Sequence, residues 1–193
     1  MFSFYLNLGI HHILEVQGYD HIMFIVALTA VYTIKEWKKV LILATAFTIG
    51  HSTTLALATL NIINVPSAII EFLIAVTIFL TGFANLFKSK EEFNPRLHTI
   101  KYFIAMFFGL IHGLGFSNYL KYMLGMEKNI VMPLLAFNVG LEMGQIVVIT
   151  VALIINLLLK KYLHIKQRDW NLVLSGAAIG MAIILMIERI PAL

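Results

Sequence analysis

The feature that most constrains this chain is the recurrence of apolar runs about as long as a lipid bilayer is thick. A helix needs about 20 predominantly apolar residues to cross the hydrocarbon core. Runs close to this length occupy residues 18–34, 40–60, 67–87, 100–118, 130–159 and 170–187. Only 12% of the 193 residues are charged, whereas a soluble domain carries about 25%. The sequence therefore predicts an all-α, polytopic membrane helix bundle with six spanning helices, as a single transmembrane domain over residues 1–193.

The first 17 residues are also apolar, but they form a short run that ends before Gly18. A segment of this length is compatible with an interfacial helix, a re-entrant piece or a seventh span. A cleavable signal peptide begins with a basic region, and no Lys or Arg precedes Lys35. We therefore expect no cleavable signal peptide.

The basic residues are unevenly distributed among the intervals between the predicted helices. Cytoplasmic connections of membrane proteins carry an excess of Lys and Arg. The intervals after the first, third and fifth helices hold Lys35, Lys38, Lys39, Lys88, Lys90, Arg96, Lys101, Lys160, Lys161, Lys166 and Arg168. The intervals on the other side of the membrane, with the C-terminal end of the chain, hold only Lys121, Lys128 and Arg189. The pattern predicts a multi-pass protein of the bacterial cytoplasmic membrane with the first set of loops in the cytoplasm. It also accounts for the net charge of +4 without a nucleic-acid partner.

Several ionisable residues interrupt the apolar runs, and all of them fall in the extracytoplasmic half or near the midplane of the bilayer. A charge at the centre of a bilayer costs at least about 2.5–3.5 kcal/mol, so such residues are functional candidates. The chain has no cysteine, which leaves nitrogen and oxygen ligands suited to nickel, cobalt or zinc. We therefore predict one divalent-metal site whose candidate ligands are Asp20, His21, His51, Glu71, His112 and Glu142.

The side-chain spacing supports one polar face on each of several helices. Asn138, Glu142 and Gln145 lie at i, i+4 and i+7 and so share one stripe of a helix. Structural explanations stay open for single residues: Asn138 and Gln145 could bond neighbouring helices, and Asp20 could cap the first predicted helix. Glycine pairs spaced by four residues, at 140 and 144 and at 176 and 180, are typical of helix-packing faces.

Five stretches in order along the chain resemble the HupE/UreJ family of small bacterial membrane proteins. They read HHILEVQGYDHIMF, TAFTIGHSTTLAL, IEFLIAVTI, FGLIHGLGFS and LLAFNVGLEMGQ, within residues 11–145. The resemblance implies nickel or cobalt uptake, with a metal-binding element formed by His12, Asp20 and His21. It also points to His51, Glu71, His112, Asn138 and Glu142. The family's usual HxxxGxDH spacing is two residues shorter than the spacing found here.

Three functions are compatible with these residues. The first is transport of a divalent transition metal, with the ion captured from the outside. The second is an intramembrane, zinc-dependent hydrolase or acyl-transfer enzyme, in which Glu71 or Glu142 is the general base and Ser52 contacts substrate. The third is a metal-binding accessory subunit. The expected partners are the metal ion and the lipid bilayer, with a second copy of the chain or a metalloenzyme-maturation protein as further candidates.

Overall fold

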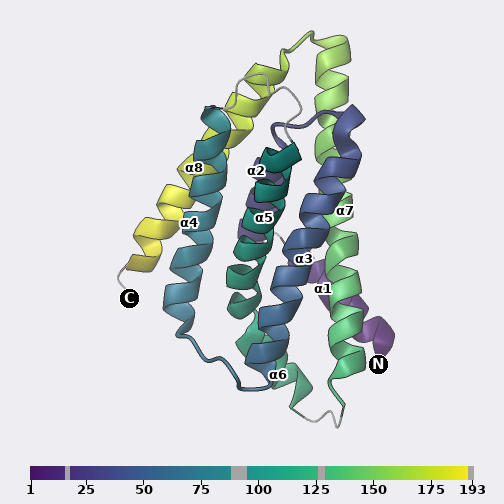
Figure 1. Cartoon of the computed structure of the whole chain (residues 1–193), viewed down its shortest axis with the longest axis vertical. Coiled ribbons are helices and arrows are strands. Elements are labelled where there is room, and N and C mark those ends of the chain that lie inside the picture. The colour runs from purple at the N-terminus through teal and green to yellow at the C-terminus, as the bar shows by residue number, and fades with distance from the viewer. Residues whose placement is uncertain (16–17, 88–94, 126–128, 191–193) are drawn as a thin grey trace.

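The computed structural model describes residues 1–15, 18–87, 95–125 and 129–190, and all regular structure in these ranges is helical (Figure 1). The elements are α1 (Phe2–Leu14), α2 (Tyr19–Thr29), the 3₁₀ turn η2 (Ile34–Glu36), α3 (Trp37–Thr59), α4 (Ser67–Leu86), α5 (Pro95–Gly115), α6 (Ser117–Leu124), α7 (Val131–Tyr162) and α8 (Gln167–Arg189). The predicted all-α membrane bundle is confirmed. Of the basic residues used to predict its topology, Lys88, Lys90 and Lys128 lie outside the described ranges.

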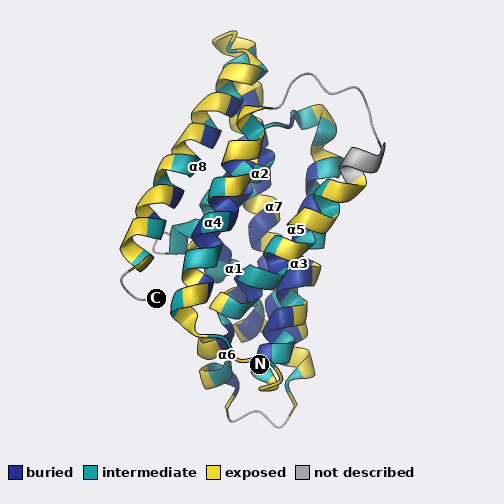
Figure 2. Ribbon diagram, turned by 60° about the vertical axis from the view of Figure 1, so that its left-hand side comes forward, coloured by how far each residue is buried: buried dark blue, intermediate teal, exposed yellow. Residues whose placement is uncertain are grey.

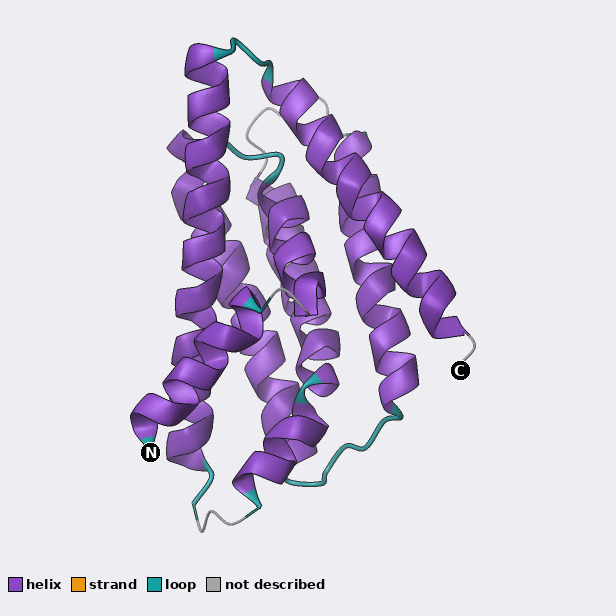
Figure 3. Ribbon diagram, turned by 180° about the vertical axis from the view of Figure 1, so that it is seen from behind, coloured by secondary structure: helices purple, strands orange, loops and turns teal. Residues whose placement is uncertain are grey.

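Three helix pairs surround the short helix α2. Helix α3 packs along α5, α4 packs along α8, and α1 crosses the first half of α7 (Figures 1 and 3). Helix α2 contacts α4, α7 and α8 from the middle of the bundle. Figure 2 shows its buried residues at the centre, whereas the outward faces of α4 and α8 are exposed. Those outward faces carry large apolar side chains, which is what contact with lipid requires.

Glycines allow two of these helix pairs to approach backbone to backbone. A Cβ atom on Gly9 would collide with the backbone of α7, and one on Gly140 would collide with the backbone of α1. Gly50 and Gly109 have the same relationship between α3 and α5. Small residues at such crossings let membrane helices pack by close van der Waals contact. The packing role predicted for the pair at 140 and 144 is therefore confirmed.

The corresponding prediction for Gly176 and Gly180 is wrong within the chain. A Cβ atom added to either residue would meet nothing within 4 Å in the part of the chain that the structure describes. Both glycines lie on α8, which is the outermost helix of its pair (Figure 2). The spacing alone could not distinguish a face used inside the bundle from one turned away from it.

The predicted count of six spanning helices is not confirmed. Helices α3, α4, α7 and α8 are long and apolar enough to cross a bilayer, and α5 with α6 makes a fifth if the 52° bend between them lies within one span. The expected first span, residues 18–34, is instead the 11-residue α2, which at 1.5 Å per residue reaches only about 16 Å. The apolar residues of α2 are buried or half-buried inside the protein. Hydropathy does not distinguish such burial from contact with lipid, so it predicts a span here that the structure does not form. Within residues 1–15, the described part of the N-terminal segment, α1 has only 13 residues and is also shorter than a span.

Helix α2 can end inside the bundle because other helices bond its last carbonyl groups. A helix leaves its final carbonyls without partners in its own backbone, and the bilayer offers no water to bond them. The Asn85 amide donates to the Ala27 carbonyl at 2.7 Å. The Gln167 amide donates to the carbonyls of Ala30 and Tyr32 at 3.1 and 3.2 Å. These bonds hold α2 in place and so fix the position of its first turn.

Candidate metal centre

Four histidines from four different helices meet near the first turn of α2. His12 lies in the last turn of α1, His21 in the first turn of α2, and His112 in the last turn of α5. His51 lies in the second half of α3. His51 and His112 are 0% exposed and His21 is 5% exposed. The chain therefore places a layer of imidazoles, hereafter the imidazole cluster, inside the bundle.

The rings of the cluster are in direct contact. The ring centroid of His21 lies 4.4 Å from that of His12 and 5.1 Å from that of His112. The His12 and His51 centroids are 5.8 Å apart. One ring nitrogen from each of His12, His21 and His51 lies within 4.8 Å of the others. These three residues form a converging set of nitrogen donors from three helices, and the His112 ring packs against His21 beside them.

Asp20 orients the His21 ring. Its Oδ1 atom lies 3.0 Å from the His21 Nδ1 atom and also accepts the His21 backbone N–H at 2.9 Å. Because an ionised carboxylate can only accept, the imidazole proton lies on Nδ1 and the Nε2 lone pair is left for another partner. The capping role that the sequence left open for Asp20 is not found, because the N-cap of α2 is Gly18 and Asp20 lies within the first turn of the helix.

Thr77 on α4 orients the His112 ring in the same way. The Thr77 hydroxyl donates to the Ile74 carbonyl at 2.7 Å and lies 2.8 Å from the His112 Nε2 atom. A hydroxyl has one proton, so with that proton on the Ile74 carbonyl its oxygen must accept from Nε2–H. The lone pair of His112 is then on Nδ1.

Five buried imidazole nitrogens have no hydrogen-bond partner within the described chain. They are His12 Nε2, His21 Nε2, His51 Nδ1, His51 Nε2 and His112 Nδ1. More than nine in ten buried polar groups in proteins are bonded, so each exception needs an explanation. The unpartnered atoms on His21 and His112 are the ones that the orienting bonds leave with a free lone pair. Neutral imidazole with a free lone pair is the form that binds a metal.

Phenylalanines cover the cluster on the side toward the basic connections, which are the loops that follow α2, α4 and α7 and the helix ends beside them, where most of the Lys and Arg residues lie. Phe24, Phe47 and Phe108 each lie about one helical turn from a histidine of the cluster on the same helix. The Phe24 and Phe47 centroids are both 5.0 Å from that of His112 and 4.9 Å from each other. The Phe108 ring lies 6.1 Å from Phe24. These three side chains, hereafter the phenylalanine layer, form an apolar partition next to the imidazoles.

Glu71 lies outside the cluster, at the opposite end of α4 from the basic connections. Its side chain is 51% exposed, and its Oε2 atom pairs with Arg189 at 3.8 Å. Arg189 also donates to the Glu71 backbone carbonyl at 2.6 Å and reaches Asp20 Oδ2 at 3.7 Å. Arg189 thus links Glu71, at the exposed rim of this end of the bundle, to Asp20, the carboxylate that orients His21. Among the described contacts, Glu71 reaches the imidazoles only through Arg189 and Asp20.

The polar stripe of α7 faces α3 beside the cluster. Glu142 accepts a hydrogen bond from Thr45 at 2.7 Å, and Gln145 accepts one from Thr48 at 3.0 Å. Asn138 donates to the Leu134 carbonyl of its own helix at 2.9 Å. Interhelical bonding, which the sequence left open for Gln145, is what the structure gives it. Glu142 is not one of the donors that converge with His12, His21 and His51.

Ser52, the residue expected to contact substrate in an enzyme, bonds its own helix. Its hydroxyl donates to the Thr48 carbonyl at 2.6 Å. Side chains of Ser and Thr commonly bond the carbonyl four residues back in a helix. With its proton on that carbonyl, the Ser52 hydroxyl has no activating base in the described contacts.

The donor set fits a divalent transition metal. Imidazole nitrogens bind zinc, nickel and cobalt, and a metal–nitrogen bond is about 2.0–2.1 Å long. Three nitrogens bound to one ion at that distance lie at most about 4.2 Å apart, slightly closer than the 4.8 Å limit that encloses them here. Binding one ion would therefore need the three nitrogens to lie about 0.6 Å closer than this limit. The carboxylate–imidazole pair of Asp20 and His21 matches the outer support that metal-binding histidines usually have.

Two parts of this site have no signal in the sequence. Thr77 is one of several threonines in apolar runs, and only the packing of α4 against α5 brings it to His112. Arg189 is near the end of the last helix, and sequence spacing does not connect it to Asp20. The phenylalanine layer could have been found, because each ring follows or precedes a histidine by three or four residues.

Comparison with known proteins identifies the family. No curated protein and no solved structure matches the chain. A family model described as HupE / UreJ protein matches residues 1–189, which include every helix and all four histidines of the cluster. The fold, the site and this match lead to one conclusion: the chain belongs to the HupE/UreJ family of membrane proteins.

Proposed function

We propose that the protein transports a divalent transition metal of the nickel and cobalt class across the bacterial cytoplasmic membrane. The observation that carries this proposal is the convergence of ring nitrogens from His12, His21 and His51, beside His112, with five buried imidazole nitrogens that have no partner among the described residues. Membership of a family associated with nickel and cobalt transport supports it. His12, His21 and His51 bind the ion, His112 completes the set, and Asp20 and Thr77 orient His21 and His112.

The charge of the site suits binding of a cation. Neutral imidazoles attract a divalent ion through their lone pairs, and Asp20 adds one negative charge through His21. Arg189, with its positive charge, lies between Asp20 and Glu71 at the rim. We infer that ions enter at this end, which is the end away from the basic connections. Under the proposed topology that end faces the outside of the cell.

A metal-binding accessory subunit is the second candidate, and the phenylalanine layer favours it. Phe24 and Phe47 are about 1% exposed and pack directly against His112. An ion moving from the cluster toward the basic connections would have to pass these rings. Transport therefore requires the layer to open, whereas a protein that only holds the metal does not need this motion.

A hydrolase is supported less well by the contacts. Its proposed general bases, Glu71 and Glu142, are bonded to Arg189 and Thr45 and do not join the converging nitrogens. A general base must lie within hydrogen-bond reach of the proton that it takes. Ser52 also lacks an activated geometry, since its proton is on a backbone carbonyl.

The first test is the metal content of the full chain, purified in detergent and equilibrated with Ni²⁺ or Co²⁺. We expect about one ion per chain and its loss in His12→Ala. The matched control is His11→Ala, because His11 is the exposed neighbour on the same helix. Equal metal content in both variants would refute the site. The two functions are then separated in sealed vesicles: accumulation of the ion indicates transport, and binding without accumulation indicates the accessory role.

A further inference from the structure

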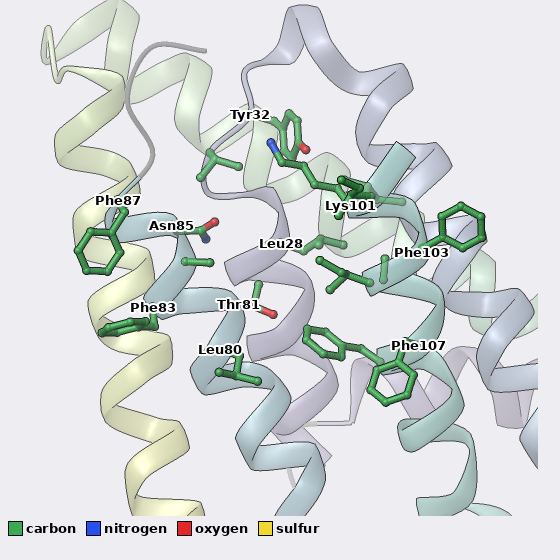
Figure 4. Close-up of a pocket in the computed structure, with 17 residues that line it drawn as sticks. Leu28, Tyr32, Leu80, Thr81, Phe83, Asn85, Phe87, Lys101, Phe103 and Phe107 are labelled. Atoms are coloured by element: carbon green, nitrogen blue, oxygen red, sulfur yellow. The ribbon is translucent and has the colours of Figure 1, made fainter. Parts of the chain in front are cut away.

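The rim of the imidazole cluster holds a positive charge at the place where a cation is proposed to enter. A groove of about 760 Å³ between α4 and α5 does not reach the cluster: its described lining includes Phe108 of the phenylalanine layer but none of the four histidines (Figure 4). At the rim, Asp20 contacts His21 through Oδ1 and Arg189 through Oδ2. An arginine so close to a cation site needs an explanation, because like charges repel.

Arg189 is held by one backbone atom and stands between two carboxylates. Its Nη1 group donates to the Glu71 carbonyl at 2.6 Å. Its Nη2 atom lies 3.7 Å from Asp20 Oδ2, and its Nε atom lies 3.8 Å from Glu71 Oε2. Both carboxylate distances exceed the about 2.7–3.2 Å of an N–H···O hydrogen bond. The guanidinium can therefore shift toward either carboxylate while its bond to the Glu71 carbonyl keeps it at the rim.

The two carboxylates differ in how close they lie to the cluster. The Asp20 side chain is 16% exposed and bonds the His21 ring directly, whereas the Glu71 side chain is 51% exposed and reaches the imidazoles through Arg189. A cation bound to the imidazoles would therefore bring its charge next to Asp20 and leave Glu71 farther away. Asp20 would then attract the guanidinium less strongly, and Glu71 would become the better partner.

We propose that Arg189 is an electrostatic latch on the metal site: it pairs with Asp20 when the site is empty and moves onto Glu71 when a divalent ion binds. Because the latch acts on the proposed metal site, it rests on the proposed function and describes how that site is regulated. In the empty site the guanidinium balances the charge of Asp20, and an incoming ion displaces it. The coupling is reciprocal, so bound metal weakens the pair of Asp20 and Arg189 by the same factor as the pair weakens metal binding.

The latch is tested by Co²⁺ binding to the full chain in detergent, measured by stopped-flow association and by titration. Arg189→Gln should raise the association rate about tenfold, the lower end of electrostatic effects on association, and should also raise the affinity. Arg189→Met, which keeps the apolar stem, should behave alike, whereas Arg189→Lys keeps the charge and should stay close to the unaltered protein. The matched control is Arg168→Gln in the exposed first turn of α8, about 32 Å away along the helix, which should change neither quantity.

The Asp20→Asn background shows whether Arg189 acts through Asp20. Without that carboxylate the arginine has no partner to exchange, so most of the gain from Arg189→Gln should disappear, as expected for two coupled residues. An equal gain in both backgrounds, or an affinity in Arg189→Gln that does not exceed that of the unaltered protein, would overturn the latch and leave the metal site in place. An unaltered protein that binds no Co²⁺ would refute the metal site itself, and the latch with it.

Discussion

The two ends of α2 show how differently this protein treats buried polar groups. At the C-terminal end, Asn85 bonds the Ala27 carbonyl, and the Asn171 and Ser175 side chains complete the network with bonds of 2.9–3.2 Å. At the N-terminal end, five nitrogens of the imidazole cluster have no hydrogen-bond partner in the part of the chain that the structure describes. Both regions are buried, so exposure does not explain the difference.

Under the proposed function, the contrast is between polar groups that hold the fold and imidazoles that bind a metal; smaller exceptions are Asn138, Gln145 and Asn156, each of which has one buried atom without a partner among the described residues. An unpartnered polar group in an apolar interior costs about 1–3 kcal/mol, so a purely structural cluster would be expected to bond its own atoms, as the Asn85 network does. The imidazole cluster accepts that cost while Asp20 and Thr77 direct its free lone pairs. The bonds around Asn85 and Gln167 keep α2 in place, and α2 in turn holds His21 within the cluster.

The largest expected effect comes from replacing a histidine of the cluster by an apolar residue. His51→Leu removes two unpartnered nitrogens and one proposed ligand. We expect metal affinity to fall by more than the about 10–100-fold that loss of an outer-shell partner costs. The metal-free protein should become more stable by about 1 kcal/mol, because the unpartnered atoms are gone. Titration calorimetry and thermal unfolding in detergent measure the two effects. A less stable metal-free variant would show that His51 is structural.

Removing the charge of Asp20 should produce the next largest effect. Asp20→Asn keeps the shape of the side chain but loses the negative charge that supports His21. We expect metal affinity to fall about 10–100-fold, as for other outer-shell carboxylates. The matched control is Glu71→Gln, because Glu71 shares the Arg189 partner but has no contact with an imidazole. If both variants lose affinity equally, the rim charge as a whole matters and the orienting bond does not.

At the other end of α2, the expected effect concerns stability alone. Asn85→Ala removes the shorter of the two hydrogen bonds to the Ala27 carbonyl, which then keeps only the 3.3 Å bond from the Ala30 N–H among the described contacts. We expect the free energy of unfolding to fall by about 1–2 kcal/mol, with metal affinity nearly unchanged. Asn118→Ala on the exposed face of α6 is the control and should have little effect on either quantity. A large loss of metal affinity in Asn85→Ala would mean that the two ends of α2 are not separable.

Much of this arrangement was predictable from the sequence, and what was not has a physical reason. Histidines on successive apolar runs predicted a common layer, because 1.5 Å per residue fixes the height of each side chain along its helix. Height does not fix the direction in which a helix face points. Glu71 and Glu142 have suitable heights, but one reaches Arg189 and the other reaches Thr45.

Hydropathy had a similar limit. Apolar residues of α2 such as Phe24 and Ala27 are buried against other helices, and a hydropathy profile gives the same value for burial in protein as for contact with lipid. The sequence therefore predicted a spanning helix where the chain forms a short central one. Contacts between helices distant in sequence, such as that between Thr77 and His112, were beyond any local pattern.

The smallest expected effect is also the most specific test of the comparison, because it changes an orienting bond and leaves every proposed ligand in place. Thr77→Val keeps the side-chain shape but removes the oxygen that accepts from His112 Nε2–H. The Nε2–H group then has no partner, so the preference for a free lone pair on Nδ1 weakens. We expect metal affinity to fall about tenfold, the lower end of outer-shell effects, with a changed absorption spectrum of bound Co²⁺. Thr81→Val is the control one turn along α4, since its hydroxyl bonds only a backbone carbonyl. An unchanged affinity and spectrum in Thr77→Val would show that His112 lies beside the ion without binding it, and the site would then consist of His12, His21 and His51 alone.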